Sequence, residues 1–450
     1  MYMRQIVRSV AALGVASVLA ACGRGPSAPP GITIGYSNDM DGAIRSCGCA
    51  VHDYGGLGRR ATFLDAVRDT VGDFLLLDGG GFFGSNVNYG RLKADLTLES
   101  MKSMRYDAIA LGEEEFGFGV DYIVERTREL ALPVVECNVY DARADTLLFA
   151  PHRVVTLSSG LKVGIIGVLG DHLKLPPQVR PGRLRVSSAA AAVRRQVRAL
   201  ADSVDLLAVV GHLRRSEAQR IARQNGDIDL IVHGSEGRPM RRMRPFGNAW
   251  LLQLAAKGLY MGIAYAVLDG HGGIRRMEAH QYPLDGRYAD APSVAKLFRA
   301  YDLNIAAKEK YNVPVGVLEA RRGLRKPFAG VDACRSCHTR ITTHWATTQH
   351  AHAYATLQEK SRQYNRDCTP CHTTGFYDTG GFVSFAVTPK LVNVQCESCH
   401  GNGYDHVADP TQALPKDAAQ ACQSCHTPQR SPDFRFEKFW PRIEHPGPDG

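Results

Sequence analysis

The sequence predicts an α/β domain followed by a small, mostly α-helical domain. Between residues 31 and 286, short apolar segments alternate with amphipathic helical patterns, which is typical of layered α/β architecture. From residue 328 onward such segments are scarce, and the pattern Cys-x-x-Cys-His occurs four times. With 450 residues and 44% hydrophobic content, the chain is long enough to bury more than one core.

Residues 1–22 are predicted to be a lipoprotein signal peptide. Two arginines precede an apolar run from Val10 to Ala21, which suits a secretory signal and is too short for a spanning helix. The run ends at Cys22 in a Leu-Ala-Ala-Cys sequence that resembles the bacterial lipoprotein box, whose cysteine is lipidated. An ordinary signal peptide is the alternative. Residues 23–30 are expected to be a flexible tether, so the protein is expected in the periplasm, lipid-anchored to the outer membrane.

Seven apolar segments of the first domain are predicted to be buried strands. Two amphipathic segments, Leu57–Arg68 and Ser188–Ser203, are predicted to be helices. In this class of fold the loops at the strand ends carry the functional side chains. The expected strands are Ile32–Tyr36, Phe74–Leu77, Ala108–Leu111, Val163–Val168, Leu206–Val210, Leu230–Val232 and Trp250–Leu254.

Five motifs of this domain resemble those of the calcineurin-like metallophosphoesterases, specifically the periplasmic 5′-nucleotidase branch. The resemblance implies an αββα sandwich over residues 31–286. It also implies a pair of divalent metals, bridged by an aspartate, that activate water against phosphorus. The motifs are Tyr36–Gly42, Leu75–Gly81, Tyr106–Phe116, Gly211–Leu213 and Asp229–Gly234.

Several metal ligands implied by the resemblance are replaced. The first motif offers Asp39 and Asp41 where an Asp and a His are expected, and the bridging aspartate falls on Gly81. A glycine cannot bridge two metals, so ordinary phosphoesterase activity is not expected. The Asn-His pair falls on Glu113 and Glu114.

The later motifs keep part of the expected ligand set. His212 is retained, but the final His-x-His falls on Ser235 and Gly237, with only His233 nearby. Carboxylates together with an imidazole could hold one hard cation. The candidates for such a residual divalent site are Asp39, Asp41, Glu114 and His212.

Cys47 and Cys49 lie in the loop that follows the first motif. This part of the chain looks like a divergent nucleotidase-like branch in which one of these positions can be selenocysteine. Two thiols one residue apart form only a strained, easily reduced disulfide. We expect a redox-active dithiol, with an inert or structural pair and a soft-metal site as the alternatives.

The four Cys-x-x-Cys-His motifs predict covalently bound haem c. In this signature two thiols bond to the two vinyl groups of one porphyrin, and the adjacent histidine binds the iron. Two Cys₄ zinc ribbons are the alternative. The thiols are Cys334, Cys337, Cys368, Cys371, Cys396, Cys399, Cys422 and Cys425, and the proximal histidines are His338, His372, His400 and His426.

Residues 328–450 resemble the tetrahaem cytochrome c-554 family. Three segments carry the resemblance, namely Trp345–Ala351, Cys399–His406 and Phe436–His445. It implies distal iron ligands on the second side of each haem. Two imidazoles make low-spin iron suited to electron transfer, whereas an open position permits substrate chemistry. The implied distal ligands are His350, His406 and His445, with His344 or His352 for the fourth iron.

Residues 287–327 are predicted to be a helix and a linker. Asp290 and Pro292 open the helix as its cap and first turn, and a basic stretch from Arg321 to Pro327 follows.

The formal net charge is +9, yet the basic residues are scattered and no nucleic-acid motif is present, so nucleic acid is not an expected partner. We expect an extracytoplasmic tetrahaem cytochrome that transfers electrons, with redox proteins and the membrane as partners. An open-haem redox enzyme and a metal-dependent phosphoesterase with a cytochrome tail are the alternatives.

Overall fold

A computed structural model describes most of the chain from residue 31 onward. It forms two compact units, and the division between them falls between Leu297 and Phe298. The predicted domain boundary near residue 328 stays a prediction. The signal peptide, the tether and the Cys47/Cys49 pair lie outside the described residues. The described ranges are 31–46, 53–84, 89–236, 245–269, 273–309, 326–414, 418–427, 431, 433–445 and 447.

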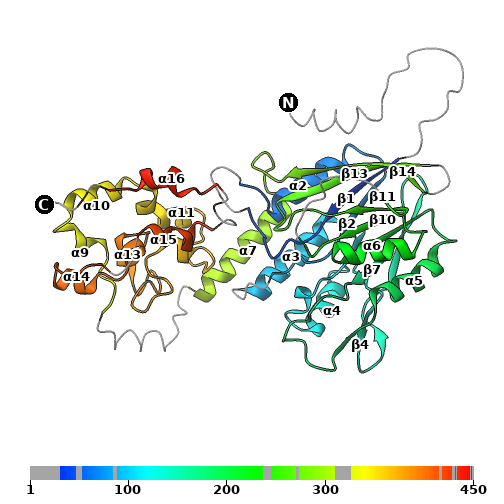
Figure 1. Ribbon diagram of the computed structural model, residues 1–450, viewed down its shortest axis with the longest axis horizontal. Coiled ribbons are helices and arrows are strands. Elements are labelled where there is room, and N and C mark those ends of the chain that lie inside the picture. Colours follow the sequence, from blue (N-terminus) through cyan, green and yellow to red (C-terminus); the bar gives the residue numbers. More distant parts are fainter. Residues whose placement is uncertain are drawn as a thin grey trace, which may run out of the picture. The chain divides into compact units, whose positions relative to one another are not determined.

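The first unit is built on two mixed β-sheets (Figure 1). A five-stranded sheet has the order β14-β13-β1-β2-β3, and a six-stranded sheet has the order β11-β12-β10-β9-β7-β6. The strands are β1 (Gly31–Ser37), β2 (Phe74–Asp78), β3 (Ala108–Ile109), β6 (His152–Thr156), β7 (Lys162–Leu169), β9 (Leu206–His212), β10 (Leu230–His233), β11 (Pro245–Phe246), β12 (Ala249–Leu252), β13 (Tyr260–Leu268) and β14 (Ile274–Pro283). A small third sheet contains β4 (Val139–Asp141), β5 (Thr146–Leu147) and β8 (Leu184–Val186).

The two large sheets share one apolar core. Ile34 and Leu77 of the first sheet belong to the same buried cluster as Ile165 and Val210 of the second. Alternate residues of a strand point to opposite faces, so the other face of β7, β9 and β10 packs against helices α5 (Ala189–Leu200) and α6 (Arg215–Gln224).

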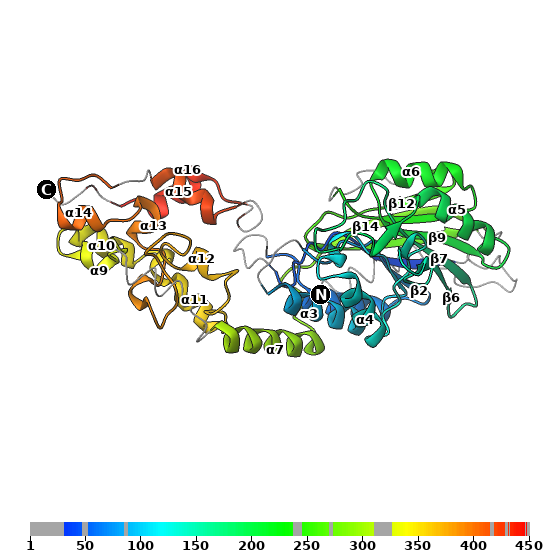
Figure 2. The ribbon, with the colours of Figure 1, turned by 90° about the horizontal axis from the view of Figure 1, so that it is seen from below.

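Helices cover both outer faces of this pair of sheets. In Figure 2, α5 and α6 lie on one side of the strands, and α3 (Gly90–Met104) and α4 (Val120–Glu129) lie on the other. Helix α2 (Leu57–Arg68) packs on α3. The predicted αββα sandwich is therefore confirmed.

The second unit is small and mainly helical. Beyond α7 (Pro292–Glu309), its described residues form short helices, turns and one isolated β-bridge. Its main apolar cluster is modest and includes Phe328, Tyr354 and Leu391. The short helices are α9 (Val331–Arg335), α10 (Thr339–Ala346), α11 (Ala353–Glu359), α12 (Thr369–His372), α13 (Cys396–His400), α14 (Tyr404–Ala408), α15 (Ala418–Cys425) and α16 (Phe436–Phe439), with 3₁₀ turns at Glu114–Phe116 in the first unit and at Gln349–His352, Pro389–Leu391 and Trp440–Arg442.

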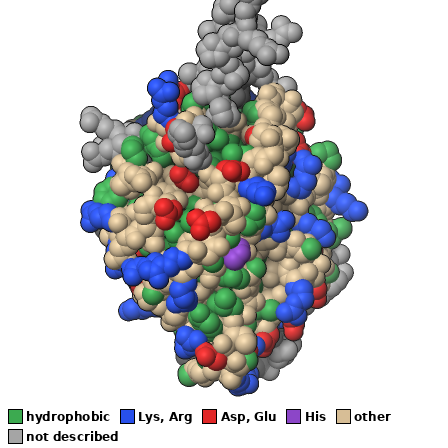
Figure 3. Space-filling model, turned by 90° about the vertical axis from the view of Figure 1, so that its right-hand side faces the viewer, with side chains coloured by type: hydrophobic (Ala, Val, Ile, Leu, Met, Phe, Trp, Pro, Cys, Tyr) green, Lys and Arg blue, Asp and Glu red, His purple; other side chains and the backbone are tan. Residues whose placement is uncertain are grey.

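Charge is dispersed on the face of the first unit that Figure 3 shows. Lys and Arg side chains are spread around this face, with Asp and Glu side chains among them. Across the residues that the structure describes, no helix combines the length and the apolarity that a bilayer span requires.

Gly167 of β7 is a position where the fold requires the absence of a side chain. A Cβ atom there would lie 1.8 Å from the carbonyl oxygen of Val135. The Gly167→Ala substitution is expected to lower the free energy of unfolding by roughly 1–3 kcal/mol, as overpacking of a tight core does. Urea denaturation measures this. Gly226→Ala is the matched control because the nearest atom to its Cβ would be 3.8 Å away, and an equal loss in both variants would contradict the packing argument.

Candidate functional site

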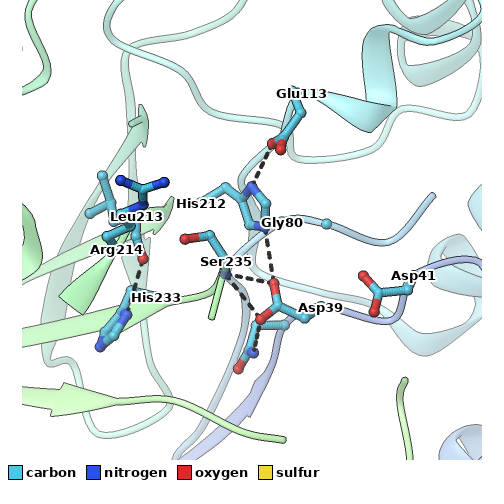
Figure 4. Close-up of polar contacts among 12 residues, drawn as sticks. Asp39, Asp41, Gly80, Glu113, His212, Leu213, Arg214, His233 and Ser235 are labelled. Atoms are coloured by element: carbon cyan, nitrogen blue, oxygen red, sulfur yellow. Dashed lines mark hydrogen bonds and ion pairs between the residues drawn. The ribbon is translucent and has the colours of Figure 1, made fainter. Parts of the chain in front are cut away.

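The predicted site of the first unit lies at the carboxyl ends of its parallel strands. Asp39 follows β1, His212 ends β9 and Ser235 follows β10, and in Figure 4 the Asp39 side chain meets the His212 ring and the backbone of Ser235. Strands β1 and β2 run parallel, as do β9 and β10. Loops at the carboxyl ends of parallel strands are the usual location of sites in open α/β sheets.

His212 forms a buried ion pair with two carboxylates. Its Nε2 lies 3.0 Å from Oδ1 of Asp39, and its Nδ1 lies 2.9 Å from Oε2 of Glu113. Burial opposes the charged imidazole, yet the hydrogen bonds and charges of Asp39 and Glu113 raise the pKa of His212 to about 10. His212 is therefore an imidazolium at neutral pH, with both ring nitrogens donating hydrogen bonds.

The Asp39 carboxylate also accepts hydrogen bonds from Ser235 and Asn38. The backbone N–H of Ser235 donates to both carboxylate oxygens at 2.8 and 3.0 Å, and Asn38 donates at 3.1 Å. Gly81 lies directly beside the ion pair, because a Cβ there would be 2.9 Å from Nε2 of His212 and 3.0 Å from Oδ1 of Asp39. An aspartate at position 81 would therefore collide with the His212–Asp39 pair.

A pair of divalent metals does not fit this arrangement. Metal ligation requires a ring nitrogen with a free lone pair, whereas both ring nitrogens of His212 are engaged by carboxylates in this arrangement. Among the described residues, no group of three or more His, Cys, Asp or Glu side chains has an arrangement that could hold a metal ion. The residual divalent site predicted at Asp39, Asp41, Glu114 and His212 thus stays a prediction without a preformed ligand cluster.

Asp41 lies at the rim of this site and pairs with a lysine. Nζ of Lys257 lies 3.3 Å from Oδ2 of Asp41, and the backbone N–H of Lys257 donates to the carbonyl of Asp39 at 2.7 Å. Burial, followed by the charges of Glu113 and Asp41, raises the pKa of Glu114. Asp39, Asp41, Ser235 and Lys257 all have φ between 47° and 87°, so strained backbone is concentrated at this site.

Three side chains that were not predicted as site residues help to build this region. Lys257 is one of them. The second is Glu115, which is fully buried and accepts hydrogen bonds from the backbone N–H groups of residues 81, 83 and 112. The third is Glu217, whose carboxylate lies 2.5 Å from Nδ1 of His172. Glu115 lies within the Tyr106–Phe116 motif but not at a predicted ligand position, and no motif contains Lys257 or Glu217. Each of the three side chains also contacts a segment that is distant in the sequence.

His233 is buried apart from the ion pair. Its Nδ1 lies 3.3 Å from the carbonyl oxygen of Leu213, and Figure 4 shows this contact. Burial lowers the pKa of His233 to about 4, so its ring is neutral.

The four haem-attachment motifs of the second unit lie on or beside short helices. Contacts link these motifs one after another in space. The first motif is joined to the third by hydrogen bonds, since the backbone N–H groups of Gly330 and Val331, at the start of α9, donate to the side chains of Glu397 and Gln395. Helix α13, with the third motif, packs on α15, with most of the fourth. Helix α15 also contacts α12 of the second motif. The motifs therefore follow the spatial order first, third, fourth, second.

Three of the four motif histidines face a second histidine from a distant segment. The ring centroids of His338 and His406 are 6.0 Å apart, those of His426 and His350 are 6.2 Å apart, and those of His400 and His445 are 6.0 Å apart. Metal–imidazole bonds are about 2 Å long, so this separation leaves room for one metal atom between two rings. His350, His406 and His445 are the side chains predicted as distal ligands.

Hydrogen bonds to backbone carbonyls orient two of the histidines that were predicted as iron ligands. The Nδ1 atom of His372 lies 2.6 Å from the carbonyl oxygen of Ala353, and that of His406 lies 2.7 Å from the carbonyl oxygen of Gln412. A carbonyl accepts only from N–H, so Nδ1 carries the proton and Nε2 is left as the free ligand atom. The donor set and its orientation fit haem.

The two candidates for the fourth distal ligand differ in their contacts. Nε2 of His352 lies 3.2 Å from the carbonyl oxygen of Ala346, whereas Nε2 of His344 is buried without a hydrogen-bond partner. The choice between them stays open.

Comparison with known proteins assigns the two halves separately. The family model "Cytochrome c554 and c-prime" matches residues 333–401. Cytochrome c-554 of Nitrosomonas europaea is 31% identical over 130 residues, which is 25% of this chain and 55% of that protein. A snake venom 5′-nucleotidase of Crotalus adamanteus is 28% identical over 274 residues, which is 54% of this chain and 46% of that protein. The chain thus spans about half the length of these curated relatives.

A solved structure supports the fold of the first unit. The 5′-nucleotidase precursor of Thermus thermophilus has a TM-score of 0.55 at 21% identity, over 63% of this chain and 60% of that one. The chain therefore joins a calcineurin-like phosphoesterase domain of the 5′-nucleotidase type to a C-terminal cytochrome c554-type domain.

Proposed function

We propose that this protein is an electron-transfer protein that carries four haems c in its C-terminal half. The observation that carries the proposal is the set of three imidazole pairs, each joining a motif histidine to a predicted distal histidine at 6.0–6.2 Å. A zinc ribbon requires no second imidazole opposite the motif histidine. The first motif is tied to the third, the third contacts the fourth and the fourth contacts the second, which suits a path for electrons.

In this proposal the residues of the second unit would hold and orient the four haems. Haem iron supplies one-electron chemistry when it is bound. The eight motif cysteines would provide the thioether attachments, and the histidines would bind from both sides. Hydrogen bonds from Nδ1 of His372 and His406 to backbone carbonyls keep Nε2 available. Two histidines on one iron favour electron transfer over substrate binding at that iron.

We also propose that the first unit is not a metal-dependent hydrolase. The His212 imidazolium neutralises carboxylates that divalent ions would otherwise neutralise, and Gly81 leaves room for it. Cys47 and Cys49 are proposed as a redox dithiol on the strength of the sequence alone. The export signal, the lipid anchor at Cys22, the periplasmic location at the outer membrane and redox protein partners belong to the same proposal.

A distal-ligand variant tests the haem arrangement. The wild-type protein is expected to contain four haems by intact mass and pyridine haemochrome assay, with low-spin electron paramagnetic resonance signals. The His406→Ala substitution removes the imidazole opposite His338, so one quarter of the haem is expected to become high-spin. His280→Ala, in β14, is the matched control and should leave the spectra unchanged. Zinc in place of haem, or an unaltered spectrum in His406→Ala, would contradict the proposal.

The buried ion pair predicts a pH-dependent contribution to stability. The folded pKa of His212, about 10, is above its ordinary value of 6.5. Its contribution is therefore full below pH 6.5 and is lost as the pH rises through about 10. Removing one partner of a buried pair costs about 3–5 kcal/mol, so His212→Gln should lower the free energy of unfolding by that amount at pH 6 and by much less at pH 10. Urea denaturation at both values measures this.

Chelation, metal content and nucleotide cleavage, measured on the wild-type protein, distinguish the hydrolase alternative. We expect a chelator to leave the wild-type melting temperature unchanged, because the imidazolium and not a metal holds the strand ends together. Two bound divalent ions, together with brisk cleavage of nucleoside monophosphates in the presence of manganese, would establish the phosphoesterase alternative instead.

Thiol labelling tests the proposed dithiol. If Cys47 and Cys49 exchange electrons with the haems, maleimide labelling of these two positions should rise when the haems are reduced. The Cys47→Ser and Cys49→Ser variants assign the labelled sites by peptide mass. Equal labelling in both haem states would show that the dithiol and the haems are not coupled.

A further inference from the structure

Glu397 is a buried carboxylate inside the third haem-attachment motif. It lies between Cys396 and Cys399 in the sequence, and only 3% of its surface is exposed. Positions between the two cysteines are free in the haem-attachment signature, so the haem chemistry does not require a glutamate there. Acidic residues are rarely buried to this extent without a specific partner.

The partners of Glu397 are backbone N–H groups, two just before the first motif and one just after the third. Oε1 accepts from Ala329 at 3.0 Å and from Gly403 at 2.8 Å, and Oε2 accepts from Gly330 at 2.8 Å. Gly330 directly precedes α9, the helix that carries Cys334. One carboxylate therefore ties the third motif to the start of the first.

Gln395 completes this attachment without adding charge. Its Oε1 accepts from the N–H of Val331 at 2.7 Å, and its Nε2 donates to the carbonyls of Lys390 and Val392. Glu397 and Gln395 thus bind three consecutive amides, those of residues 329, 330 and 331. Together they fix the first motif against the third.

The carboxylate of Glu397 belongs to one motif and lies at the start of the other. Glu397 stands between Cys396 and Cys399 of the third motif, and two of the amides that it binds directly precede the helix that carries Cys334. Among the described residues, no Lys or Arg forms an ion pair with Glu397. A charge that is buried and unpaired is poorly screened by solvent or salt.

We propose that Glu397 is a positioning residue that holds the first haem motif against the third and lowers the midpoint potentials of both of these haems. The inference rests on the proposed tetrahaem function. One-electron reduction of ferric to ferrous iron adds a negative charge, which a nearby unscreened carboxylate disfavours. The first and third motifs lie at one end of the spatial series, so this bias favours residence of electrons at the fourth and second motifs.

Spectropotentiometric titration of Glu397→Gln tests this proposal. The substitution removes the charge and keeps the shape, so two of the four midpoint potentials should rise while the other two stay at their wild-type values. Asp332→Asn is the matched control. Asp332 also lies beside the first motif, but its side chain is 82% exposed, so solvent screens its charge and its removal should have a much smaller effect.

A second variant separates charge from attachment. Gln395→Ala removes the other half of the attachment without changing the charge, so its potentials should stay close to wild type. A rise in Gln395→Ala as large as that in Glu397→Gln would show that geometry causes the shift and would overturn the electrostatic role. Unchanged potentials in Glu397→Gln would overturn it as well.

If the Glu397→Gln protein does not carry all four haems, the haem content of each motif tests the proposal instead. Peptide mass mapping shows which motifs carry haem. Loss confined to the first and third motifs is the expected result, whereas loss confined to the third motif, or spread over all four, would overturn the positioning role. A wild-type protein without haem would instead contradict the proposed function itself, so the two failures are distinguishable.

Discussion

Three pairs of imidazole rings with centroids 6.0–6.2 Å apart constrain the second unit, and in the proposed function each pair would hold one haem iron. The paired rings come from segments that are far apart in the chain, such as His338 with His406 and His350 with His426. Short helices and turns bring these segments together. Apolar packing contributes little to this, because the apolar cluster of this unit is small. Bound porphyrin would contribute apolar surface that the polypeptide lacks. The unit is therefore organised by ligand geometry more than by a conventional apolar core.

The first unit depends on the opposite arrangement, in which the protein supplies its own cation. Strand-end loops that present several carboxylates need positive charge nearby, and His212 provides it by donating to Asp39 and Glu113. Positive φ angles at Asp39, Asp41 and Ser235 show that the loops keep a strained path. Gly81, where the family resemblance implies a bridging carboxylate, leaves space for the His212 side chain, so the absence of a side chain at this position and the ion pair are compatible with each other.

Local patterns predicted most of the elements but few of the contacts. The helix expected at Leu57–Arg68 has those bounds, and all seven expected strands are present with small shifts at their ends. Strands β13 and β14 were not anticipated, although they form one edge of a sheet. The replacement of a bridging aspartate by Gly81 was inferred from its motif and stays a prediction. The roles of Lys257, Glu217 and Glu397 could not be inferred from the sequence, because each depends on a hydrogen bond or ion pair with a distant segment, and spacing along the sequence does not encode such contacts.

The buried carboxylates of the two units have different partners, and this difference affects the proposed function. In the first unit Asp39 is neutralised by an imidazolium, which removes its long-range field and leaves a structural ion pair. In the second unit, the partners of the Glu397 carboxylate among the described residues are neutral backbone amides. These hydrogen bonds stabilise the carboxylate without cancelling its charge. A cation at this place would have secured the same attachment, yet it would also have removed the field at the first and third motifs. Attachment by backbone amides is therefore the arrangement that combines rigid positioning with a lasting electrostatic bias on electron transfer.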